Sequence, residues 1–147
     1  MAPKQNQAPA ELDPGILPGL IGYRLRLAQQ AVFRDYAGAV PDVSPGRVGM
    51  LVLVEANPGV TQSALARALG LDRSTMVGLV DALEARGILE RRRGEDRRTN
   101  GLWLTRAGRA LLGRVKRRIS QHERRVASHL TLAERAQLIA LLAKLAR

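Results

Sequence analysis

The sequence predicts a mainly α fold that carries one small antiparallel β-hairpin. Leu, Val and Ala supply most of the apolar content and only 3% of the 147 residues are aromatic, which favours helices. Apolar residues recur at 3.6-residue spacing along most of the chain, as in amphipathic helices. A polar connection at residues 93–100 separates two short runs, 88–92 and 101–104, that are typical of paired strands.

The first long helix is expected from residue 16 to about residue 40. Residues 1–13, rich in Pro, Gln and Ala, precede it and are expected to form a flexible tail. Pro18 falls in the first turn, where the missing N–H costs nothing, and Pro41 stops the helix.

A second helix is expected over residues 45–56. Ser44 provides its cap and Pro45 its first position, where the fixed φ of proline is favourable. The Asn-Pro-Gly run at residues 57–59 ends it.

The next segment predicts a helix-turn-helix. Thr61 opens a short helix over residues 62–68 that breaks at Gly70. Asp72 then caps a helix over residues 73–86. After the hairpin, two more helices follow, one capped by Thr105 and reaching about residue 128, the other capped by Thr131 and spanning 132–144.

The net charge of +11 is concentrated in one part of the chain. Residues 1–60 hold five basic and five acidic residues, whereas residues 61–147 hold nineteen basic and eight acidic ones. Such an excess indicates a polyanionic partner. The basic residues are spread over turns, strands and several helices, so nucleic acid fits better than a membrane surface.

Residues 61–112 read TQSALARALGLDRSTMVGLVDALEARGILERRRGEDRRTNGLWLTRAGRALL. This stretch resembles the MarR family pattern: T-Q-x-x-L-A-x-x-L, a polar helix start, V-x-x-L-E-x-x-G, a hairpin containing D-R-R, then L-T-x-x-G. The resemblance covers about a third of the chain strongly, and the flanking helices fit the family's layout.

The resemblance implies a winged helix-turn-helix lobe flanked by N- and C-terminal dimerisation helices. It divides the chain into a tail at 1–13, a dimerisation helix at 14–43, a DNA-binding lobe at 44–104 and dimerisation helices at 105–147. The implied protein is a homodimer that binds double-stranded DNA at a palindromic operator and is released by a small effector. We expect repression in the cytoplasm, with activation as the alternative outcome.

The expected DNA contacts come from both helices of the helix-turn-helix and from the wing. A helix in the major groove needs small polar side chains at its start, and free N–H groups at a helix start suit a phosphate. Arginines at a hairpin tip suit the negative potential of the minor groove, and the resemblance has an aspartate, here Asp96, steady one of them. The candidates are Thr61, Gln62, Ser63, Asp72, Arg73, Ser74, Thr75, Val77, Arg97 and Arg98.

Two positions depart from the family pattern. Val77 and Gly78 stand where a hydroxyl and a basic residue are frequent. Val77 suits a thymine methyl group, while Gly78 offers only close backbone approach. Base readout by this helix is therefore expected to depend more on residues 73–75.

The effector is expected to be a small aromatic acid or an acidic derivative, bound between the lobe and the dimerisation helices. Aromatic rings beside an arginine suit such a ligand. The candidates are Tyr23, Arg24, Phe33, Tyr36 and Met50. Packing of the aromatic residues in the dimer core is the alternative.

The arginines of the fifth helix have three readings: a solvated face with salt bridges, contact of Arg106 or Arg109 with DNA phosphate, or neutralisation of an anionic ligand by Arg117 or Arg118. The segment carries Arg106, Arg109, Arg114, Lys116, Arg117, Arg118, Arg124 and Arg125 against Glu123.

Several function classes are disfavoured. With no cysteine, thiol sensing and disulfides are excluded. His122 and His129 lie about 10 Å apart along one expected helix, so we expect surface histidines and no metal site. Phosphate-loop and hydrolase motifs are absent, so neither an enzyme nor a cofactor is expected. The alternative function is a basic architectural or RNA-binding protein without sequence preference.

Overall fold

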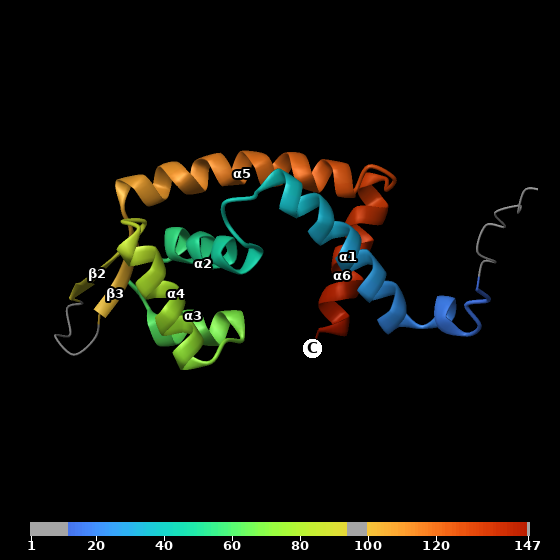
Figure 1. Cartoon of the computed structure of the whole chain (residues 1–147), viewed down its shortest axis with the longest axis horizontal. Helices are drawn as coiled ribbons and strands as arrows, with labels where there is room; N and C mark the ends of the chain where they lie inside the picture. The colour runs from blue at the N-terminus through green and yellow to red at the C-terminus, as the bar shows by residue number, and fades with distance from the viewer. Residues whose placement is uncertain (1–11, 94–99, 147) are drawn as a thin grey trace, which may run out of the picture. The chain divides into compact units, whose positions relative to one another are not determined.

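The computed structural model describes residues 12–93 and 100–146, and all helices and strands below belong to these ranges. The chain divides into two units, Met1–Arg34 and Asp35–Arg147. Figure 1 shows the elements in chain order. They are η1 Leu17–Gly19, α1 Ile21–Ala39, α2 Pro45–Ala56, β1 Val60–Thr61, α3 Gln62–Leu69, α4 Arg73–Ala85, β2 Leu89–Arg93, β3 Asn100–Leu104, α5 Arg106–Val126 and α6 Leu132–Leu145.

The first helix begins later than predicted. Pro18 lies in a 3-10 turn that ends at Gly19, and Leu20 has an extended backbone (φ −89°, ψ 126°). The α-helix starts only at Ile21. Glycine has a weak helical preference, so the turn that proline favours does not continue as an α-helix.

The predicted helix-turn-helix is confirmed. Thr61 caps α3 by accepting a hydrogen bond from the Ala64 N–H. Gly70 then adopts φ +64°, which lets the chain reverse into the cap of α4 at Asp72. A left-handed residue at this place favours glycine because a Cβ would clash with the following carbonyl.

The hairpin belongs to a three-stranded antiparallel sheet of order β1-β3-β2. Leu89 pairs with Leu104 and Arg93 with Asn100 in the predicted hairpin. The third strand, β1, was not predicted, because two residues are too few to show an alternating pattern.

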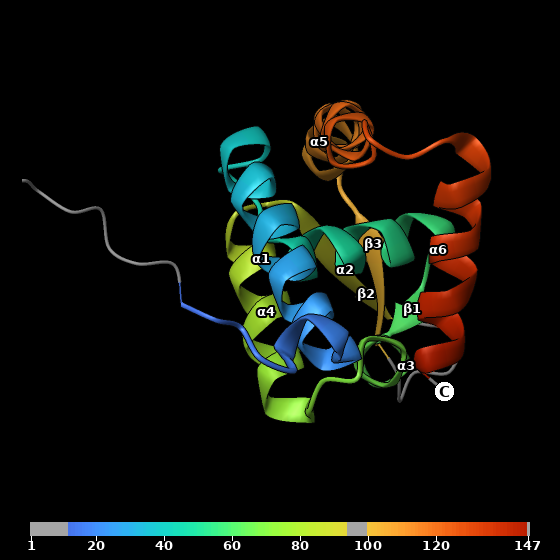
Figure 2. The ribbon, with the colours of Figure 1, turned by 90° about the vertical axis from the view of Figure 1, so that its right-hand side faces the viewer.

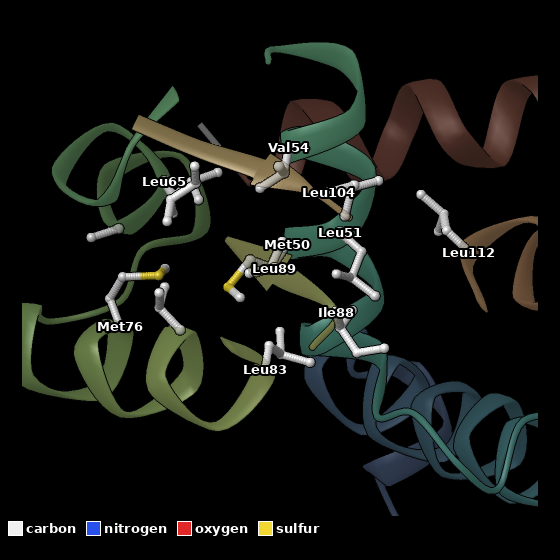
Figure 3. Packing of buried hydrophobic residues seen from close by; sticks show 13 residues of the cluster. Met50, Leu51, Val54, Leu65, Met76, Leu83, Ile88, Leu89, Leu104 and Leu112 are labelled. Atoms are coloured by element: carbon white, nitrogen blue, oxygen red, sulfur yellow. The ribbon is translucent and has the colours of Figure 1, made fainter. Parts of the chain in front are cut away.

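The core of the second unit lies between α2, the helix-turn-helix and the sheet (Figure 3). Met50 and Leu51 of α2 are fully buried, and α4 contributes Met76 and Val80 from its inward face. Leu112 of α5 closes the same cluster from the other side of α2. The helix-turn-helix therefore packs on α2, and α2 in turn packs on α5.

The long helix α5 covers α2 in both ribbon views (Figures 1 and 2). A second cluster joins α5 to the C-terminal end of α1 through Tyr36, Val40 and Val115. The last helix, α6, has no buried residue. No helix in the described part of the chain is both long and apolar enough to cross a membrane.

The start of α5 rests directly on the backbone that enters β2. The Thr105 N–H donates to the Ile88 carbonyl (3.1 Å), and Thr105 caps α5 through the Gly108 N–H (3.0 Å). A Cβ at Gly108 would lie 2.1 Å from the Ile88 carbonyl oxygen. Only glycine allows this approach without movement of the backbone.

We predict that Gly108→Ala destabilises the protein by about 1–3 kcal/mol or more, because the clash is with backbone rather than with a flexible side chain. Gly113→Ala in the same helix is the matched control, since a Cβ there meets nothing within 4 Å. That control should stabilise by about 0.5–1 kcal/mol. Chemical denaturation of both variants checks this, and equal effects would contradict the close approach.

Candidate DNA interface

Helix α4 has one buried and one exposed face. Met76, Val80 and Leu83 are buried, at helical spacing. Arg73, Ser74, Thr75, Val77 and Gly78 are exposed. The residues that were proposed from the sequence for base contact thus share the outer side and the start of this helix.

The start of α4 is organised around the carboxylate of Asp72. Its Oδ1 accepts hydrogen bonds from the Thr75 N–H (2.8 Å) and the Ser74 hydroxyl (2.5 Å), and its Oδ2 accepts from the Thr75 hydroxyl (2.5 Å). These donors, the Ser74 hydroxyl first, hold the pKa of Asp72 well below its usual range. Asp72 is therefore an ionised cap, and both hydroxyl protons point toward it.

A hollow of about 530 Å³ lies between α3 and α4. Gln62 and Ser63 line it from α3, while Arg73 and Val77 line it from α4. Arg67 also lines it and was missed by the sequence analysis, although it lies four residues after Ser63 and so on the same face of α3. Arg67 and Arg73 give this hollow two exposed positive charges.

Arg91 of β2 fastens the base of the hairpin to α4. Its guanidinium pairs with Asp81 (2.5 Å) and Glu84, and its backbone N–H donates to Glu84 (3.3 Å). The Asp81 hydrogen bond is the main reason why the pKa of Arg91 is raised. Gln62 Oε1 accepts from the same guanidinium at 3.5 Å. This cluster was not predicted from the sequence, in which its only feature is the i, i+3 spacing of Asp81 and Glu84.

The predicted contacts at the hairpin tip, Arg97 and Arg98 with Asp96, lie outside the described residues. The described base of the hairpin is basic and partly aromatic. Arg92 lies over the Trp103 ring, with its guanidinium carbon 5.4 Å from the ring centroid. Arg92 also pairs with Glu90.

The proposed effector residues lie in both units of the chain. In the first unit, Arg24 Nε donates to the Pro18 carbonyl (2.8 Å), Tyr23 lies beneath the Arg26 guanidinium, and Phe33 is 51% exposed. In the second, Tyr36 and Met50 are buried. The Tyr36 hydroxyl donates to the Val43 carbonyl (2.8 Å), and burial raises its pKa.

Met50 is fully buried within the lobe core. A ligand would reach its side chain only if neighbouring side chains moved. The packing role of Met50 is evident, and its ligand role stays a prediction.

His122 is not a surface histidine, contrary to the prediction. Only 3% of it is exposed, and its Nδ1 lies 2.6 Å from Asp35 Oδ1. Arg125 donates to both oxygens of the same carboxylate (3.0 and 2.8 Å), and the Tyr36 ring meets the imidazole edge-on. The partner that allows burial, Asp35, lies 87 residues away, so no local pattern reveals it.

His129 lies beyond the end of α5 and is exposed, so the two histidines do not share one helix. Within the described ranges, no group of three or more His, Cys, Asp or Glu residues is placed to hold a metal ion.

A family model described as MarR family matches residues 42–99. A putative transcriptional regulatory protein for the hcr operon of Thauera aromatica is 39% identical over 142 residues, covering 94% of this chain and 86% of that protein.

Two solved structures are similar over nearly the whole chain. The transcriptional repressor CouR bound to a 23-mer DNA duplex has a TM-score of 0.89 and 40% identity, covering 94% of this chain and all of that one. CouR bound to p-coumaroyl-CoA has a TM-score of 0.84 and 38% identity, covering 93% of this chain and 99% of that one.

We predict that Asp35 makes stability depend on pH in the acid range. Hydrogen bonds from Arg125 and then His122 lower the pKa of Asp35 to about 2, against about 3.9 when unfolded. A lowered folded pKa contributes stability that is complete above the unfolded value and is lost as the pH falls from about 4 toward 2.

Melting temperatures at pH 5 and pH 2.5 check this. The wild type should lose more stability across this range than Asp35→Asn, which has no carboxylate to protonate. Asp42→Asn is the control, because Asp42 is exposed and lies 3.5 Å from its arginine partner. Parallel losses in all three proteins would contradict the assignment.

Proposed function

Because this chain belongs to the MarR family of transcriptional regulators, we propose that it represses transcription by binding a palindromic operator as a homodimer, and that a small aromatic effector releases it. The exposed start of α4 is the observation that carries the proposal, since it presents polar, basic and methyl groups on a rigid helix. The likeness to a repressor bound to a DNA duplex supports it.

We assign the major-groove contacts to the start of α4 and the phosphate contacts to the hollow beside it. Arg73 is the principal base-reading side chain, because it is exposed and has no acidic partner among the described residues. Thr61, which caps α3, and Gln62, Ser63 and Arg67 within α3 are assigned to the phosphates. Arg97 and Arg98, supported by Asp96, remain minor-groove contacts proposed from the sequence.

The proposed dimer would use apolar surface that the single chain leaves open. In α6, Leu138, Ile139 and Leu141 are each 44–54% exposed. In the first unit, Ile16 and Ile21 are 79% and 65% exposed. Apolar side chains grouped in this way are typical of protein–protein contacts rather than of a solvated surface.

The proposed effector class is an aromatic carboxylic acid or its coenzyme A thioester. CouR, 38% identical to this chain, binds p-coumaroyl-CoA. Tyr23, Phe33 and Tyr36 supply aromatic rings and Arg24 supplies a cation for such a ligand. The proposed action is binding without catalysis, in the cytoplasm where the chromosome lies.

A basic architectural protein without sequence preference is the second candidate. It is favoured by the valine and glycine at positions 77 and 78, which reduce the polar groups available for base readout. Sequence preference distinguishes the two candidates.

We predict that the protein prefers a palindromic site in its own promoter region over random duplex by about 10³-fold or more. Arg73→Ala should weaken operator binding by about 1–3 kcal/mol and reduce the preference. Arg86→Ala, which removes an exposed charge at the other end of α4, should change affinity little. Gel-shift titrations at fixed salt measure both, and equal affinity for random duplex would favour the architectural candidate.

We also predict that p-coumaroyl-CoA or a related aromatic thioester dissociates the operator complex, while free coenzyme A does not. An effector that binds the DNA-free protein must also stabilise that protein against unfolding. The gain is about 2.7 kcal/mol when the effector is present at one hundred times its dissociation constant. Fluorescence anisotropy of labelled operator measures release. Complexes that survive aromatic acids and their thioesters alike would rule out this effector class.

A further inference from the structure

Seven of the eight basic residues of α5 fall into two groups, and the eighth, Arg109, donates to the Leu104 carbonyl (2.8 Å). Those on its flanks pair with acidic residues of neighbouring elements: Lys116 with Glu55, Arg118 with Asp42 (3.5 Å), and Arg125 with Asp35 (2.8 Å). These pairs hold α5 against α2 and the end of α1. The charges of these three residues therefore stabilise the packing of α5.

The second group lies on the outer side of α5. We call Arg106, Arg114, Arg117 and Arg124 the α5 ridge. All four are exposed, and none makes an ion pair with any residue in the described ranges. Arg106, Arg117 and Arg124 are separated by eleven and seven residues, which returns each to the same face of an α-helix.

Among the residues that the structure describes, acidic side chains do not neutralise the ridge. Glu123, the acidic residue of α5, is engaged by Arg135 at 3.0 Å. Ala110, Gly113 and Gln121 fill the ridge between the arginines, so its exposed surface carries positive charge and no large apolar side chain. It therefore differs from the apolar surfaces that we assign to the dimer.

The ridge faces away from the candidate DNA interface. α2 lies between α5 and the helix-turn-helix (Figures 1 and 2). The buried side of α5 packs on the second unit itself, through Leu112 in the lobe core and Val115 against Tyr36. A duplex bound at α4 would meet the opposite side of the lobe. The charge of the ridge is thus not used by that duplex.

We propose that the α5 ridge binds the phosphates of a second DNA duplex, so that one dimer can hold two DNA segments together. Arg106 and Arg124, the ends of the ridge, are separated by 18 residues, about 27 Å along the helix axis. At 3.4 Å per base pair, roughly eight base pairs of duplex cover this length. A linear polyanion of that reach matches a row of guanidinium groups better than a compact anion does.

Binding at the ridge is non-specific. Its arginines lie along the side of a long helix that does not enter a DNA groove, so they contact phosphates and do not read base edges. Non-specific contacts of this kind have dissociation constants of about 10⁻⁴–10⁻⁶ M. Tethering to the operator raises the local concentration of neighbouring DNA to about the millimolar range. A segment on the same DNA molecule is therefore bound most of the time, whereas a separate duplex binds in proportion to its concentration.

A two-duplex capture experiment tests the proposal. Biotinylated operator duplex is fixed on beads and loaded with full-length dimer, and unbound protein is washed away. A fluorescent duplex of unrelated sequence is then added at about 0.1 mM, the weak end of the expected dissociation constants, in about 0.1 M salt, and its binding is read at equilibrium. The wild type should retain the second duplex, with capture falling steeply as salt rises. Arg117→Gln combined with Arg124→Gln should reduce capture about tenfold or more and leave operator retention unchanged.

The matched control is Arg34→Gln combined with Arg86→Gln, which removes the same charge from exposed positions off the ridge. It should capture the second duplex like the wild type. Equal loss in both variants would mean that total charge decides, and would overturn the proposal. So would a wild type that captures no second duplex, or a ridge variant that releases the operator. Operator binding by the wild type is measured separately. Loss of that binding would contradict the proposed function, whereas loss of second-duplex capture alone would contradict only the role of the ridge.

Discussion

The burial of α2 is the constraint on which the rest of the second unit depends. Met50, Leu51 and Val54 lie at the centre of a cluster to which the helix-turn-helix, the sheet and α5 each contribute. A close-packed interior transmits displacement instead of absorbing it. Because α4 packs on α3, α3 on α2 and α2 on α5, a shift of α5 must move the helix-turn-helix or open a void. An effector that repositions the long helices has a physical route to α4.

Ion pairs and close backbone contacts reinforce this stack at its edges. Arg91 joins the hairpin to α4, Asp35 joins α1 to α5 through His122 and Arg125, and Thr105 joins α5 to the chain entering β2. Each contact links elements far apart in sequence. The hairpin, α4 and the long helix α5 are thereby held in one arrangement, as the preorganised DNA interface that we propose requires.

Local sequence patterns predicted most elements, because caps and breakers act within a few residues. Thr61, Asp72 and Thr105 cap the helices as expected, and Gly70 makes the expected turn. Local patterns did not predict features that depend on residues far away in the sequence. The burial of His122 depends on Asp35, and β1 exists only through pairing with β3. Arg67 was overlooked because its exposure on the hollow depends on how α3 meets α4.

The cap at Asp72 has a consequence for which bases can face the start of α4. The hydroxyl protons of Ser74 and Thr75 are committed to the carboxylate, so each oxygen offers only lone pairs to an approaching duplex. Phosphate oxygens and the carbonyl edges of guanine and thymine carry no proton to share with them. The exocyclic amino groups of adenine and cytosine do. In the interface that we propose, the chemistry of this helix cap therefore favours amino-bearing bases opposite Ser74 and Thr75.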